Sequence, residues 1–241
     1  MRISRTWTAR LATTGLLLLS AVPVLAGSFR VATLAGGAAA TPDNARFVEV
    51  PAPVVVHIIG ATLFCVLGAF QFHPGFRRRR PGWHRVTGRV LVPCGIAAAL
   101  SGIWMTLRYP LPELDGARFG VLGIERLVLG SVMAAAIVIS FRAILRRDIV
   151  RHRAWMMRGY AIGMGAGTQA VVLLPWMLTV GDTDVFAHAM LMGLAWTINI
   201  LVAEWIIRRR GPAARRRAAA SHHPRGSGVQ SGAISAQTSV S

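Results

Sequence analysis

The chain has 241 residues, of which 54% are hydrophobic and 15% are charged, and its formal net charge at pH 7 is +18. A soluble domain has roughly 25% charged residues, so this composition argues against a soluble fold. All 27 basic residues are arginines that lie beside apolar runs instead of on a soluble face, which argues against a nucleic-acid-binding protein.

Six long apolar runs predict an all-α polytopic membrane protein, a bundle of six transmembrane helices. In chain order they cover residues 11–35, 52–72, 87–107, 121–141, 156–180 and 185–207. Each run has about 20 residues or more, which is the length of helix that crosses the hydrocarbon core of a bilayer. The runs lack the alternation of apolar and polar residues that barrel strands show.

The first run permits two interpretations. Residues 1–26 have a basic start, an apolar middle and Val24-Leu25-Ala26 before Gly27, as a signal peptide does. The run continues to about Leu34, which favours a retained N-terminal transmembrane helix, or signal anchor, within residues 1–36.

The rest of the chain divides into a core and a tail. The five remaining runs predict a membrane core at residues 50–207. Residues 208–241 are first rich in Arg and Ala and then in Ser and Gly, with too little apolar surface to fold alone. We therefore expect a disordered cytoplasmic tail.

The arginines are distributed asymmetrically about the six runs. Twenty-two lie at run ends on one side, and five lie on the other, namely Arg30, Arg46, Arg108, Arg118 and Arg126. Because cytoplasmic loops are enriched in basic residues, this asymmetry predicts that both termini are cytoplasmic in a multi-pass protein of the cell membrane.

Four histidines fall into two layers of the predicted bundle. His57 and His188 lie a few residues inside the outer ends of their runs, and His84 and His152 open runs at the inner side. Two imidazoles from facing helices at one depth hold a b-type haem, so His57/His188 and His84/His152 are candidate haem b ligand pairs. The alternative is that they are interfacial side chains, since polar rings cost little near the head groups.

Two similar segments place arginines beside the inner histidines. Arg85 and Arg89 follow His84, and Arg153 and Arg158 follow His152. Guanidinium groups pair well with carboxylates, so these four arginines are candidates to hold an anionic group such as a haem propionate. The alternative is that they only orient the helices in the membrane.

Three further polar residues lie inside apolar runs. Thr168, Gln169 and Asn199 have uncharged side chains that hydrogen-bond readily, and each is surrounded by apolar sequence. Polar groups within a membrane bundle commonly bond across helices, and we expect the same here.

Several segments of the core resemble one family. They are His57 with Gly60, Leu67-Gly68-Ala69-Phe70-Gln71-Phe72, Trp83-His84-Arg85-Val86-Thr87-Gly88-Arg89, Ser101-Gly102, and His152-Arg153-Ala154-Trp155-Met156-Met157-Arg158-Gly159-Tyr160-Ala161. They resemble the predicted membrane proteins grouped as domain of unknown function 2306. The resemblance covers the core at residues 50–207, and it implies a multi-helix bacterial membrane protein without implying an activity.

Two functions follow as hypotheses. In the first, the protein binds haem b and transfers electrons in the membrane, with a quinone or another redox partner. In the second, it is a non-redox transporter or a lipid- or quinone-binding membrane subunit, and the same arginines contact the anion directly. The lipid bilayer is a partner in both.

Overall fold

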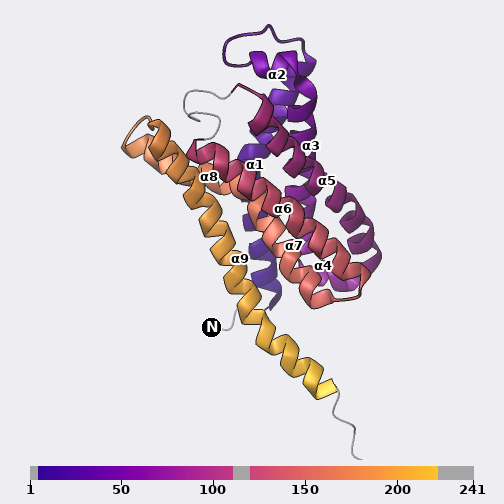
Figure 1. Ribbon diagram of the computed structural model, residues 1–241. Helices are drawn as coiled ribbons and strands as arrows, with labels where there is room; N and C mark the ends of the chain where they lie inside the picture. Colours follow the sequence, from indigo (N-terminus) through magenta and orange to yellow (C-terminus); the bar gives the residue numbers. More distant parts are fainter. Residues whose placement is uncertain (1–4, 111–119, 222–241) are drawn as a thin grey trace, which may run out of the picture.

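Figure 1 shows the computed structural model, in which residues 5–110 and 120–221 are described. All regular elements in these two ranges are helices: α1 (Arg5–Ala35), α2 (Ala45–Glu49), α3 (Pro51–Gln71), α4 (Pro74–Arg79), α5 (Pro81–Arg108), α6 (Val121–Leu145), α7 (Ile149–Gly163), α8 (Gly165–Thr179) and α9 (Val185–Ser221). Five helices are long and apolar enough to cross a membrane, and the bent pair α7 and α8 makes up to six spans. The prediction of an all-α polytopic membrane protein is confirmed.

The fifth run differs from the continuous helix that its length predicts. It is divided into α7 and α8, which meet at Met164 with a bend of 42°. Gly163 and Gly165 flank the break, and glycine destabilises a helix interior because it has the largest backbone entropy to lose. Close packing favours glycine here, because a Cβ at Gly165 would collide with the indole of Trp196 on α9.

Most helices of the bundle pack against helices that are one or two elements away in the chain. α5 packs against α3 and α6, α6 packs against α7, and α9 packs against α7 and α8. Phe64 of α3 and Ile137 of α6 lie at its centre, with exposed fractions of 1% and 0%. Gly95 of α5 lets them meet, since a Cβ there would lie 2.7 Å from both side chains.

α1 lies on the outside of this core and packs against α3 and α8 (Figure 1). Half of its large apolar side chains are exposed, including Leu18, Leu25 and Phe29. In a bilayer such side chains contact lipid, where apolar surface has no cost. The structure therefore gives the first run the length and the exposed apolar surface of a membrane span.

The last helix continues beyond the predicted end of the membrane core. α9 extends through the arginine-rich segment to Ser221, where the sequence predicts a disordered tail from residue 208. Arginine and alanine are both strong helix formers, so a helix that leaves the membrane can continue through them. The rest of the predicted tail, residues 222–241, lies outside the described residues.

Candidate functional site

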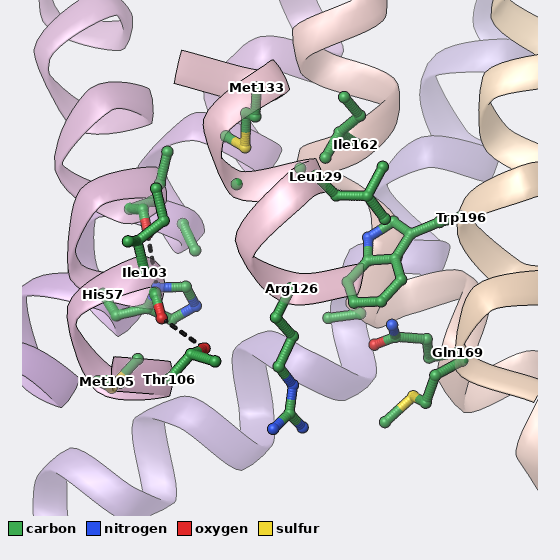
Figure 2. Close-up of a pocket in the computed structure, with 18 of the residues that line it drawn as sticks. His57, Ile103, Met105, Thr106, Arg126, Leu129, Met133, Ile162, Gln169 and Trp196 are labelled. Atoms are coloured by element: carbon green, nitrogen blue, oxygen red, sulfur yellow. Dashed lines mark hydrogen bonds between the residues drawn. The ribbon is translucent and has the colours of Figure 1, made fainter. Parts of the chain in front are cut away.

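A cavity of about 390 Å³ lies within the half of the bundle that carries α2 (Figure 2). It is surrounded by α3, α5, α6, α7, α8 and α9, with α2 at one end. Most of its lining is apolar, including Phe64, Ile103, Leu129, Met133 and Trp196. Pockets for small organic molecules have this character and volumes of about 300–1,000 Å³, with a few polar groups that orient the ligand.

His57 of α3 is the first of these polar groups. Its Nδ1 lies 2.8 Å from the carbonyl oxygen of Ala98 on α5. A carbonyl only accepts hydrogen bonds, so Nδ1 carries a proton, and in the neutral ring Nε2 is then an acceptor. The ring lies close to Gly102, where a Cβ would be 3.3 Å from the His57 Cε1. The Nε2 edge therefore faces away from α5, and Figure 2 shows the ring extending into the cavity.

Gln169 of α8 is the second polar group. It is 8% exposed, and its amide nitrogen has no hydrogen-bond partner among the described residues. Figure 2 shows its carboxamide beside Trp196, on the side of the cavity away from His57. A buried donor without a partner costs about 1–3 kcal/mol, so such a group calls for an explanation. A ligand oxygen in the cavity would supply the missing acceptor.

The two other intramembrane polar residues behave as the sequence predicts. The Thr168 hydroxyl donates to the Asn199 side-chain oxygen at 2.8 Å, and the Asn199 amide donates to the Ala161 carbonyl at 3.1 Å. These bonds join α8, α9 and α7. Gln169 differs from its neighbour Thr168 because the Gln169 amide nitrogen is buried without a hydrogen-bond partner among the described residues.

Aromatic and basic side chains lie at the end of the cavity beside α2. Phe47 of α2 packs edge-on against Tyr109. The guanidinium groups of Arg30 and Arg46 lie 4.8 and 4.6 Å from the centre of the Phe47 ring. The Tyr109 hydroxyl donates to the Val50 carbonyl at 2.6 Å, and burial raises the pKa of Tyr109. These contacts hold α2 against α1 and the C-terminal end of α5.

Only one of the two predicted outer histidines lies in the described lining of this cavity. His57 lines it, whereas His188 is absent from its described lining and lies in the first turn of α9. The His188 Nδ1 is 3.4 Å from the Thr183 hydroxyl. α3 and α9 are not among the helix pairs that pack closely in the described residues.

The inner histidines are attached to different neighbours. The Ser140 hydroxyl lies 2.9 Å from the His152 Nδ1 and donates to the His152 carbonyl at 3.0 Å. The His84 carbonyl accepts from the Gln71 amide at 3.4 Å. α6 packs against both α5, which carries His84, and α7, which carries His152, and the latter two are not a closely packed pair in the described chain.

The four predicted anion-binding arginines are also separated. Arg85 and Arg89 are exposed on α5, and Arg153 is partly buried on α7. Arg158 forms a two-point ion pair with Glu204 of α9 and lies 4.8 Å from the centre of the Trp155 ring. The charge of Arg158 is therefore matched within the protein.

The residue set fits a haem only in part. The described lining of the cavity includes one imidazole, that of His57, and the described residues contain no cluster of three or more His, Cys, Asp or Glu side chains. If this lining held a haem together with His57, the second side chain to hold it would supply sulfur, either that of Cys65 or that of a methionine such as Met133 or Met192.

The helices that carry the cavity match a known protein family. Residues 54–207 match the family described as predicted membrane protein (DUF2306). The chain belongs to this family. The DUF2306 match starts in α3 and ends in α9, so it contains both His57 and Gln169 and does not contain α1. No curated protein and no solved structure matches the chain.

Proposed function

We propose that this DUF2306 protein binds a lipid-soluble molecule with a hydroxylated ring, the chemical class of the membrane quinols, in the His57 cavity. The observation that carries the proposal is the buried, unpartnered amide of Gln169 in a cavity that His57 also lines. A ring hydroxyl donates to the His57 Nε2, and a second ring oxygen accepts from the Gln169 amide.

The remaining lining suits the body of such a ring. Phe64 and Trp196 offer aromatic faces, and Leu129 and Met133 are apolar. Aromatic contacts are worth about 0.5–1.5 kcal/mol beyond the burial of area. The helices of a multi-pass membrane protein face lipid on their outer surfaces, so a lipid-soluble ligand reaches the bundle from the bilayer.

The test uses the purified full chain in detergent and a benzoquinol with a decyl chain as the probe. We expect saturable binding by equilibrium titration. His57→Ala removes one hydrogen bond of about 1–1.5 kcal/mol and should weaken binding about tenfold. His188→Ala is the matched control, because His188 lies outside the cavity lining, and it should leave the affinity unchanged. Equal effects of the two variants would reject the site.

Haem b binding stays a second candidate because of one contact. A metal-bound imidazole almost always donates its other N–H to a carbonyl or carboxylate, as the His57 Nδ1 does to Ala98. A bound haem would supply one-electron transfer, and His57 would be one of the residues that hold it. Visible spectra of the oxidised and dithionite-reduced protein, expressed with adequate haem, test this. A Soret band that His57→Ala abolishes supports haem, and its absence rejects haem.

A further inference from the structure

A second cavity of about 280 Å³ lies between α1, α3 and the break between α7 and α8. Five residues line both this cavity and the first one: His57, Ala61, Cys65, Gly163 and Ala166. Three of the five are alanine or glycine, so the wall that the two cavities share is made largely of small side chains.

The second cavity has a different chemical character from the first. Its lining comes mainly from apolar side chains, including those of Val24, Ile58 and Met164. The Ser20 hydroxyl, which also lines it, donates to the Leu16 carbonyl at 2.8 Å and lies 3.7 Å from the Met164 sulfur. It therefore makes its hydrogen bond within the protein, and this cavity suits hydrocarbon.

α1 covers the second cavity because it is held at two points along its length. Gly167 of α8 lies against the backbone of Leu19, where a Cβ would collide. Gly27 lies against Ile58 of α3, where a Cβ on Gly27 would be only 2.8 Å from the Ile58 side chain. The segment between these points spans about 12 Å at the helical rise of about 1.5 Å per residue. It includes Pro23, which removes one helical hydrogen bond and lines the cavity.

We infer that the second cavity holds the apolar chain of the ligand whose ring occupies the His57 cavity, and that α1 forms the wall between this chain and the bilayer. The occupant is a saturated or isoprenoid hydrocarbon chain attached to the ring. The inference rests on the proposed function, and it adds the place where the lipid tail of the ligand binds. The family match starts after α1, so the tail site depends on a helix outside the matched region.

The experiment compares two probes on three proteins. The probes are a benzoquinol with a methyl group and the same ring with a decyl chain. The proteins are the wild type, Val24→Trp, which fills the second cavity, and Leu25→Trp, a control at a neighbouring position that is 70% exposed. Measurements at one detergent concentration keep the partition of each probe into micelles constant across the proteins.

We expect Val24→Trp to weaken binding of the decyl probe about tenfold, because the chain loses its packing contacts. Binding of the methyl probe should stay within about twofold, which also shows that the variant is folded, and Leu25→Trp should change neither affinity. If the wild type binds neither probe, the proposed function fails and the inference falls with it. If the wild type binds the methyl probe but Val24→Trp does not weaken the decyl probe, only the tail site is rejected.

Photolabelling gives a readout that does not depend on affinity. A benzoquinol whose chain ends in an alkyl diazirine should label the wild-type chain at the residues of α1 and α3 that line the second cavity, including Val24 and Ile58. The methyl probe should compete for the ring site and prevent this labelling. Labelling confined to lipid-facing residues such as Leu25 and Phe29 would overturn the tail site.

Discussion

The two halves of the bundle use histidine in different ways. In the half that carries α2, His57 is fixed through Nδ1 to the Ala98 carbonyl, and its Nε2 edge faces a cavity. In the other half, His152 is attached to Ser140, which is completely buried, and the nearby Arg158 is paired with Glu204. A polar group whose hydrogen bonds and ion pairs are made within the protein stabilises the bundle. A polar group with an unused hydrogen-bonding atom at a cavity is available to a ligand.

The largest effect is expected in the half where the charges are paired. Arg158→Ala leaves Glu204 without its partner in a partly buried position, where the two side chains are 30% and 26% exposed. We expect the free energy of unfolding to fall by about 1–3 kcal/mol, measured by denaturant titration in detergent. Binding of the decyl benzoquinol to the folded protein should stay within about twofold.

A paired substitution separates lost charge balance from lost packing. Arg158→Met with Glu204→Met removes both charges and keeps apolar volume, so it should be more stable than Arg158→Ala alone. If Arg158→Ala abolished ligand binding without lowering stability, Arg158 would instead belong to a ligand site, and the contrast between the two halves would be wrong.

The second prediction concerns stability and affinity at Gln169. Gln169→Leu removes the unpartnered amide, so the free energy of unfolding should stay the same or rise by about 1 kcal/mol. The affinity for the decyl benzoquinol should fall about fivefold to tenfold, because the ligand oxygen loses its donor. The measurements are the same denaturant titration and equilibrium binding assay.

Asn199→Leu provides the matched comparison for Gln169→Leu. Asn199 bonds to Thr168 and Ala161, so its loss should lower stability by about 1–2 kcal/mol without the selective loss of affinity. If both variants only lowered stability, the Gln169 amide would have no role toward a ligand.

The sequence predicts the membrane spans well because each one is a long apolar run that must satisfy its own backbone in lipid. It does not predict the break at Met164, because glycines such as Gly165 also occur in unbroken membrane helices, and the contact with Trp196 is long-range.

The candidate site is predictable only in part. His57 stands out as a lone imidazole in apolar sequence, and the structure places it at a cavity. Gln169 and Thr168 are adjacent polar residues, and only their surroundings show that one is paired and the other is not. The pairing of histidines in the sequence rests on depth alone, and equal depth does not decide which helices are neighbours.

The third prediction concerns the oxidation state of the ring. Because the His57 Nε2 accepts hydrogen bonds, it can pair with the hydroxyl of a quinol but not with the carbonyl of the matching quinone. We expect the decyl quinol to bind about fivefold more tightly than the quinone, the value of one neutral hydrogen bond. Titrations under anaerobic conditions measure both, and His57→Ala should remove the preference. A stronger affinity for the quinone would show that the ring of His57 presents a donor.

The smallest effect is expected from a change that moves the His57 ring without removing any of its atoms. A Cβ at Gly102 would lie 3.3 Å from the His57 Cε1, so Gly102→Ala requires the ring to shift by a few tenths of an ångström. We expect the quinol affinity to fall about twofold to threefold, since hydrogen bonds weaken when their geometry departs from the optimum. Gly88→Ala on the same helix is the control, because a Cβ there meets nothing within 4 Å. If Gly102→Ala and Gly88→Ala bound the quinol with equal affinity, the position of the His57 ring against α5 would not control its hydrogen bond to the ligand.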